Sequence, residues 1–275
     1  MVVSKQFARD TCSIRFTFTI EQALTTINPY TNHTYLTPYE YVPRFVTLTD
    51  DEVVRYKELS QKIIKTWGRA KNDEEAAKKL ENLMFLRANI HKSAENKIFE
   101  FCKILDQLGK DISNTIVFVS PEQIDQVMSI LSTRRIRAHR YTSQQGKTPE
   151  KKYGGISERE HIIKAFRAGD YQILVAMKCL DEGIDIPSAE TGIILASSTN
   201  PREYVQRIGR IIRYCEGKKK SRLFDVIIEP SWERLNPQLV QIERKIFSKE
   251  MERIKDISEN AVNRLQIIDA VYKRA

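Results

Sequence analysis

The chain has 275 residues, 41% of them hydrophobic, and a formal net charge of +9 at pH 7. This length and apolar content allow one large or two modest domains with a substantial core. The mean hydropathy of -0.44 and the lack of a long apolar run argue against a membrane span, and the N-terminus MVVSKQFARD lacks the apolar core of a signal peptide.

The net charge indicates the class of partner to expect, and the positions of the cysteines indicate the cellular compartment. A positive balance favours a polyanionic partner, with nucleic acid as the leading class. The four cysteines are scattered without a C-x-x-C pair, at Cys12, Cys102, Cys179 and Cys215. This spacing argues against a zinc site or a disulfide framework and is typical of the reducing cytosol. We therefore expect a cytoplasmic protein with no metal ligands of its own.

The first part of the chain predicts a connector followed by helices. Residues 1–48 contain the stretch NPYTNHTYLTPYEYVP, which is typical of irregular structure. Thr49-Asp50-Asp51-Glu52 is a capping box that predicts a long helix through Trp67. A second helical and charge-rich region runs from about Asp73 to Leu108, so we assign residues 49–110 to a helical segment.

The middle of the chain predicts a parallel sheet. Short apolar runs alternate with helical patterns, and the predicted strands are 115–119, 136–141, 172–177, 191–196 and 223–228. Helices between them are predicted from Ser120-Pro121, from the capping box at Ser157 with a stop at Gly169, and from Asn200-Pro201. Continuously apolar strands alternating with helices indicate an α/β fold with helices on both faces of the sheet, over residues 111–230. Residues 231–275 predict amphipathic helices that either pack on this domain or bind a protein partner.

The loop YTSQQGKT, residues 141–148, ends like the phosphate-binding P-loop G-x-x-x-x-G-K-(S/T). However, Tyr141 stands where the first glycine is required, and its side chain would crowd the phosphates. A P-loop also runs straight into a helix, whereas Thr148 is followed by Pro149 and further loop residues. We interpret this segment as a basic loop. The alternative, a self-contained nucleotide enzyme that uses Lys147, requires the chain alone to bind nucleotide.

Two other segments carry residues suited to chemistry. In KCLDEGIDIP, Gly183 permits a turn beside a ligand and Asp185 offers a carboxylate to a ribose hydroxyl, although a plain loop has the same composition. In QRIGRIIR, Arg210 and Arg213 are three residues apart, so a helix would point them to one face. Two guanidiniums suit a phosphate, and the alternative is a solvated basic face. Gly209 costs about 1 kcal/mol in a helix interior, which close approach of another surface would explain.

Together these segments resemble the motifs of superfamily 2 helicases. QRIGRIIR matches motif VI, (Q/H)-R-x-G-R-x-x-R, and KCLDEGIDIP resembles the motif V region. TIVFVS resembles motif IV, and GISEREHIIKAFRAGDYQILVAM resembles the stretch that joins motifs IV and V. The motifs occur in family order between residues 111 and 230. The flanks YVPRFVTLTDDEVVRYKELSQKI and KSAENK resemble the DEAD/DEAH-like branch that contains type III restriction subunits and excision-repair helicases.

The resemblance implies the second RecA-like lobe of an ATP-dependent motor that acts on DNA or, alternatively, RNA. The sequence contains neither G-x-x-x-x-G-K-(S/T) nor a D-E-x-(D/H) box after an apolar strand. The family therefore implies that ATP and Mg²⁺ are bound mainly by a first lobe outside this chain, and that residues 1–48 connect to it. We expect no ATP hydrolysis by the chain alone. A RecA-like module that only binds a protein is the competing interpretation.

The resemblance also assigns roles to residues. Arg210 and Arg213 are expected as arginine fingers. Expected near the nucleotide are Gly183, Asp185, Gln206 and Arg207. Expected at the nucleic acid are Ser120, Tyr141, Ser143, Lys147, Arg159 and Lys178. Met177 stands where many family members have Thr or Ser, so Lys178 is expected to replace that phosphate contact.

Overall fold

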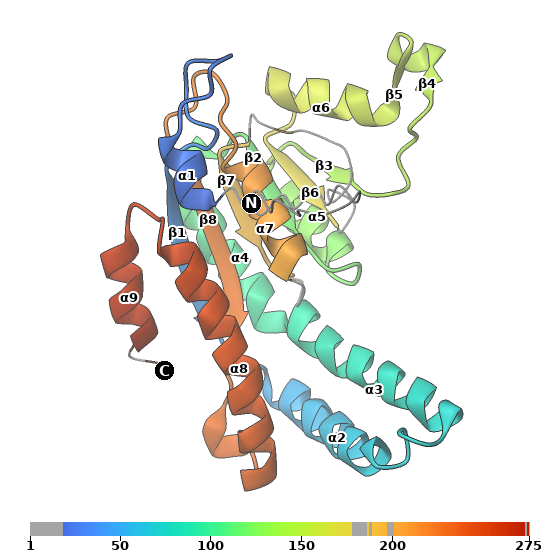
Figure 1. Cartoon of the computed structure of the whole chain (residues 1–275). Coiled ribbons are helices and arrows are strands. Elements are labelled where there is room, and N and C mark those ends of the chain that lie inside the picture. The colour runs from blue at the N-terminus through green and yellow to red at the C-terminus, as the bar shows by residue number, and fades with distance from the viewer. Residues whose placement is uncertain (1–18, 178–185, 187–188, 197–200, 273, 275) are drawn as a thin grey trace, which may run out of the picture.

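The computed structural model describes residues 19–177, 186, 189–196, 201–272 and 274, with the backbone alone at 201–203, 205, 206 and 272. Its centre is a six-stranded sheet in the order β1-β8-β7-β2-β6-β3, and every neighbouring pair is parallel (Figure 1). The strands are β1 Tyr39–Val46, β2 Thr115–Phe118, β3 Ala138–Tyr141, β6 Ile173–Ala176, β7 Thr191–Ile194 and β8 Ser221–Ile228. The predicted α/β fold is confirmed, and so are the five predicted strands.

Strand β1 differs from the prediction, because it lies inside the expected connector. It pairs with β8 over its whole length, from Tyr39 opposite Ser221 to Val46 opposite Ile228. Pro43 can be accommodated because β1 is an edge strand and needs a ladder partner on one side only. The rings of Tyr39 and Tyr41 are completely buried. The sheet therefore begins at Tyr39, and the boundary expected at residue 48 is wrong.

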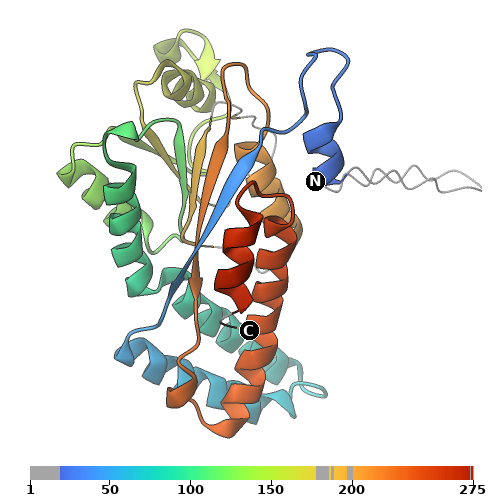
Figure 2. The same cartoon turned by 90° about the vertical axis from the view of Figure 1, so that its left-hand side faces the viewer.

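Helices cover both faces of the sheet. On one face lie α4 Glu95–Leu108 and α5 Ile124–Thr133, and on the other lie α6 Glu158–Ala168, α7 Pro201–Ile211 and α8 Pro237–Ser258. In Figure 2 the green helices α4 and α5 are on one side of the sheet and the orange-to-red helices α7 and α8 are on the other. Because α4 buries Phe101, Ile104 and Leu105 against the sheet, the α/β domain starts before residue 111.

Local capping signals fix most helix ends. The capping box at Ser157 starts α6, with the Ser157 amide donating to Glu160 Oε2 at 2.9 Å, and Gly169 ends the helix with a φ of +82°. The predicted start at Ser120-Pro121 is wrong. Residues 120–123 form a turn in which the Gln123 amide donates to the Ser120 carbonyl at 3.1 Å, so α5 begins at Ile124.

A helical hairpin extends beyond the carboxyl ends of β1 and β8. It consists of α2 Asp50–Trp67 and α3 Glu74–Ser93, which pack along each other and confirm the predicted helices (Figure 1). The Thr49 amide donates to Glu52 Oε2 at 2.9 Å, as the capping box predicts. Tyr56 stacks on His91 with ring centroids 4.8 Å apart and hydrogen-bonds Glu243 of α8, so the base of the hairpin is fixed to the lobe.

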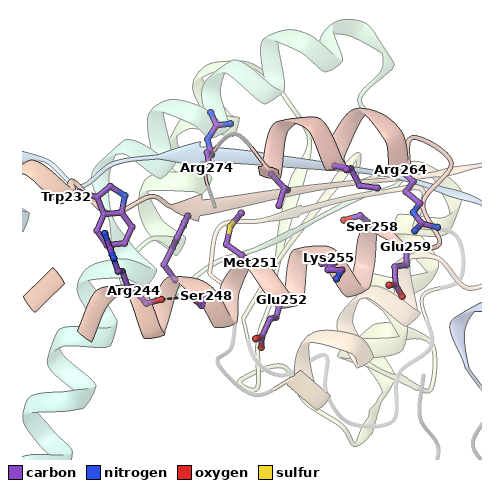
Figure 3. A pocket seen from close by; sticks show the side chains of 13 residues that line it. Trp232, Arg244, Ser248, Met251, Glu252, Lys255, Ser258, Glu259, Arg264 and Arg274 are labelled. Carbon is purple, nitrogen blue, oxygen red and sulfur yellow. Dashed lines mark hydrogen bonds between the residues drawn. The ribbon is translucent and has the colours of Figure 1, made fainter. Parts of the chain in front are cut away.

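The C-terminal helices pack on the lobe. Helix α8 buries Leu239, Phe247 and Ile254, and α9 Arg264–Tyr272 turns back beside it against β1. A groove of about 680 Å³ lies between α8 and α9, with Trp232 and Arg244 at one end and Glu259 and Arg264 at the other (Figure 3). Within the described residues, no helix is both long enough and apolar enough to cross a membrane.

Candidate functional site

The residues of interest lie at two opposite edges of the sheet. Since all six strands are parallel, the segments after β2, β3, β6 and β7 leave from the carboxyl edge. Helix α7 follows β7 and runs back, so its end lies at the amino edge. There the Thr37 amide donates to the Ile212 carbonyl at 2.7 Å, and the Ser221 hydroxyl donates to the Ile211 carbonyl at 3.2 Å. Thr37 directly precedes β1, and Ser221 is the first residue of β8.

Helix α7 presents its apolar side to the sheet, as predicted. Ile208, Ile211 and Ile212 are all at most 2% exposed. Gly192 of β7 allows this close packing, because a Cβ there would collide with the Ile211 side chain. A Cβ at Gly209, in contrast, would meet nothing within 4 Å. The expected reason for Gly209, a close approach to another surface, is therefore not found within the described part of the lobe.

The arginines of this segment separate into two groups. Arg207 is buried, donates from its NH1 to the Ala196 carbonyl at 3.1 Å, and lies over the Phe118 ring at 5.6 Å. It therefore fastens α7 to the carboxyl edge. Arg210 and Arg213 are half-buried near the amino edge. Arg213 lies two residues past the end of α7, where it forms an isolated β-bridge with Leu36, so the expected shared helical face is wrong for Arg213.

A buried carboxylate, not predicted from the sequence, joins α7 to three other elements. Asp225 of β8 is fully buried, and its Oδ2 accepts hydrogen bonds from Tyr41 at 2.8 Å and Tyr204 at 2.7 Å. Arg253 of α8 places NH1 3.0 Å from the same oxygen. Burial raises the pKa of both tyrosines, and the Asp225 charge raises it further. Burial opposes the charge of Arg253, but Asp225 together with Tyr204 and Glu250 outweighs this effect and raises the Arg253 pKa.

At the carboxyl edge, Lys97 and Ser120 lie in the interior close to the ends of β7 and β2. Lys97, from the segment KSAENK, donates from Nζ to the Leu195 carbonyl at 2.7 Å, and burial lowers its pKa to about 8. Ser120 Oγ and Gln123 Nε2 are buried and make no hydrogen bond to a described residue. Ser120 was predicted as a nucleic-acid contact, and Gln123 was missed because nothing in its local pattern distinguishes it.

Lys97 gives a prediction for the pH dependence of stability. Its pKa is about 8 in the folded protein, as is that of buried Lys218, against 10.5 when unfolded. Between these values the unfolded chain binds more protons, so the free energy of unfolding should rise with pH from about 8 to about 10. The slope is at most about 1.4 kcal/mol per pH unit for each lysine. Above pH 10 the raised tyrosine pKa values reverse the trend.

Urea unfolding at several pH values between 7.5 and 10 measures this slope. The Lys97→Met variant should lose the share of the pH slope that comes from Lys97. Lys103→Met is the matched control, because Lys103 is an exposed residue of the same helix. An equal slope in the Lys97→Met variant and the unmodified protein would contradict the prediction.

The GKT loop is shaped by the start of α6. The Gly146 amide donates to Glu158 Oε2 at 2.9 Å, and Arg159 donates to the carbonyls of Gln145 at 3.1 Å and Thr142 at 3.3 Å. The carboxylate of Glu158 thus takes the amide that a P-loop would offer to a phosphate. After the loop, β4 Pro149–Glu150 pairs antiparallel with β5 Ile156–Ser157, so a small hairpin and not a helix follows.

The residues predicted at the nucleic acid occupy different environments. Ser143 and Lys147 are exposed on this loop. Tyr141 is completely buried and Arg159 is 6% exposed, with its guanidinium 5.9 Å from the Tyr141 ring centroid. These two side chains hold the loop in place and are not presented at the surface, which corrects their predicted role. Outside the described residues lie Lys178, Gly183 and Asp185, and also the side chain of Gln206.

Comparison with known proteins finds helicase domains that are similar to this lobe. Residues 96–215 match the helicase conserved C-terminal domain family. The DNA 3'-5' translocase XPB2 of Sulfurisphaera tokodaii is 28% identical over 209 residues, which are 70% of this chain and 44% of that protein. The ATP-dependent RNA helicase DBP8 of Scheffersomyces stipitis is 26% identical over 150 residues, which are 54% of this chain and 30% of that protein.

A solved structure, the C-terminal part of the Fun30 ATPase domain, has the same fold. It superposes with a TM-score of 0.53 at 17% identity and covers 79% of this chain and 99% of that one. The matched family domain contains Arg207, Arg210 and Arg213. The chain spans less than half the length of the two curated relatives, so these matches concern only part of each relative.

Proposed function

We propose that this chain is half of an ATP-dependent helicase or translocase, the second RecA-like lobe of a superfamily 2 motor, because residues 96–215 match the helicase conserved C-terminal domain family and the sheet is parallel throughout. A first lobe with the P-loop completes the motor. One observation carries the proposal. The lobe holds Arg210 and Arg213 at the amino edge of its sheet and exposed basic loops at the carboxyl edge, so nucleotide and nucleic acid have separate faces.

At the amino edge, Arg210 and Arg213 are the residues that would contact ATP. Bound ATP with Mg²⁺ supplies a phosphoryl group whose negative charge must be stabilised during transfer. A guanidinium is permanently charged and offers planar donors, which fits that task. Arg207 fastens α7 through the Ala196 carbonyl and so keeps the helix in place. Gln206, Gly183 and Asp185 are proposed around the nucleotide on the family motifs alone.

At the carboxyl edge, nucleic acid would lie along the loop after β3 and the β4–β5 hairpin. Exposed Ser143, Lys147, Lys151 and Lys152 offer a hydroxyl and three ammonium groups for backbone phosphates. Lys178 is proposed as a further phosphate contact on the family motif alone, whereas Ser120, also predicted there, is only 4% exposed and is not part of this surface. Lysines contact phosphates as point charges, so binding should depend little on base sequence. We infer DNA as the track, because the translocase XPB2 is named for DNA, and RNA is the alternative that DBP8 favours.

The salt dependence of nucleic-acid binding tests the carboxyl face. The logarithm of the association constant should fall linearly with the logarithm of the salt concentration, by about 0.7 per phosphate contact on a single strand. Replacing Lys147 and Lys151 with Ala should therefore reduce the slope by about 1.4 and weaken binding at low salt. Fluorescence anisotropy with labelled single-stranded DNA and RNA of one sequence measures both quantities and separates the two tracks.

Lys110→Ala is the control for this experiment, since Lys110 is exposed just ahead of β2 at the amino edge. It should leave both affinity and slope unchanged. Binding that responds equally to Lys110→Ala and to the loop variant would mean that the attraction comes from net charge and not from a defined face.

A further inference from the structure

Three successive carbonyl groups at and just past the end of α7 accept hydrogen bonds from groups outside the helix. A helix leaves its last carbonyls without intrahelical partners. Here the Ile211 carbonyl accepts from the Ser221 hydroxyl and from Lys218 Nζ, and the Ile212 carbonyl accepts from the Thr37 amide. The Arg213 carbonyl accepts from Lys218 Nζ at 3.0 Å. Lys218 is thus the one described side chain that bonds both Ile211 and Arg213 through a charged donor.

A tight turn aims Lys218 back at the helix. The Lys218 amide donates to the Cys215 carbonyl at 3.1 Å, and Gly217 has a φ of +82°, a conformation that a residue with a side chain rarely adopts. The turn places Lys218 in the interior, at 7% exposure, whereas the next residue, Lys219, is exposed. An ammonium group beside the last carbonyls also meets the negative end of the helix dipole.

Arg213 depends on this cap because the helix itself does not reach it. Helix α7 ends at Ile211, and the position of Arg213 is set by its bridge to Leu36 and by the bond from Lys218 to its carbonyl. We propose that Lys218 is a positioning residue, which holds the backbone of Arg213 so that the Arg210 and Arg213 guanidiniums meet the phosphate in one geometry. This inference rests on the proposed function of the two arginines.

The burial of Lys218 supports a positioning role. Burial lowers the pKa of this ammonium group to about 8, so desolvation works against the charge. A surface lysine such as Lys219 would avoid that cost. The charge is held in place by main-chain carbonyls, with the Ser221 hydroxyl and Thr37 amide completing the cap. Thr37 belongs to the segment that leads into β1, so the cap also ties this segment to the arginines.

The first test needs only this chain and no ATP. Hydrogen exchange followed by NMR is measured in Lys218→Met and in the matched control Lys219→Met. The informative amides are Ile212, bonded to the Ile208 carbonyl at 2.9 Å, Tyr214, bonded to Tyr35 at 3.2 Å, and Thr37. In Lys218→Met these amides should exchange about tenfold faster, because the variant lacks a charge-assisted hydrogen bond to the main chain. The amides of β2 and β6 should keep their exchange rates.

Equal exchange in the two lysine variants, or an increase spread evenly over the sheet, would overturn the positioning role. If Lys218→Met does not fold, Ser221→Ala replaces it. This variant removes one bond to the Ile211 carbonyl and should accelerate the same amides by a smaller factor, whereas unchanged rates would count against the cap.

The second test uses the chain joined to its P-loop lobe. Lys218→Met should lower kcat for ATP hydrolysis about tenfold with little change in KM, because the cap affects the transition-state contacts and not ground-state binding. Lys218→Arg, which keeps a cationic donor, should recover part of the loss. If Arg213→Ala leaves hydrolysis intact, the proposed function fails while the exchange result still stands. If Arg213→Ala abolishes hydrolysis and Lys218→Met does not alter kcat, the positioning inference fails alone.

Discussion

Replacing Arg213 with alanine is expected to lower kcat for ATP hydrolysis by about 10³-fold or more in the motor formed with the P-loop lobe. An arginine that reaches the transferred phosphoryl group acts mainly on the transition state, where negative charge is redistributed. The loss should therefore appear in kcat and in kcat/KM together, with a small effect on KM. A steady-state assay at saturating nucleic acid measures it, and Arg210→Ala is expected to behave in the same way.

Two controls separate this effect from general damage. Arg264→Ala removes an exposed arginine of α9, far along the chain from α7, and should leave kcat unchanged. Arg213→Lys keeps the charge but loses the planar pair of donors, so it should recover only part of the rate. Full activity of Arg213→Ala would favour the alternative of a RecA-like module that binds a protein partner. Hydrolysis by the chain alone that Arg213→Ala abolishes would contradict the half-motor proposal.

Replacing Arg253 with methionine should destabilise the lobe by about 3–5 kcal/mol, because it leaves a buried carboxylate without its cation. Asp225 is fully buried, and Arg253 is its nearest positive group, at 3.0 Å. Arg253 also lies over the Tyr204 ring at 4.0 Å, so its removal loosens the contact between α8 and α7. Urea unfolding at pH 7 measures the change in the free energy of unfolding.

The double variant Asp225→Asn with Arg253→Met tests the cause of this loss. It removes the uncompensated charge but keeps an amide that can hydrogen-bond Tyr41 and Tyr204, so it should be more stable than Arg253→Met alone. Arg244→Met is the surface control, since Arg244 is an exposed residue of α8, and it should change stability by less than about 0.5 kcal/mol. A loss in Arg253→Met no larger than in Arg244→Met would mean that the buried pair contributes nothing.

The sequence predicted the elements whose signals are local. The central strands are continuously apolar because both faces of a parallel sheet are covered, and α6 has its stop and start signals within a few residues of its ends. Strand β1 was missed because its pairing with β8 joins residues about 180 positions apart, from Tyr39 opposite Ser221 onward. Its polar residues and Pro43 are tolerated at an edge, and only the assembled sheet defines which strand is an edge.

In the candidate site, too, some features could be predicted from the sequence and others depend on the fold. Motif VI, with Arg207, Arg210 and Arg213, is contiguous, so residue types and spacing were enough to single it out. Their roles depend on what the fold places around them. Arg207 turns inward to the Ala196 carbonyl. The spacing predicts Arg213 on the helix, but α7 ends at Ile211 and Arg213 lies beyond it. Tyr141 and Arg159 pack against each other in the interior, which no local pattern distinguishes from exposure on a basic loop.

The run Lys218-Lys219-Lys220 shows what the sequence determines and what the tertiary structure determines. By itself the sequence determines the parallel α/β fold, the helicase motifs and a basic surface, because these follow from apolar periodicity, residue order and charge. Three consecutive lysines, however, are equivalent in sequence. Tertiary structure assigns Lys218 to the buried end of α7, Lys219 to solvent and Lys220 to an ion pair with Glu40 at 2.6 Å. The physical reason is the turn at Gly217, whose left-handed backbone directs only one of the three toward the carbonyls that need a donor.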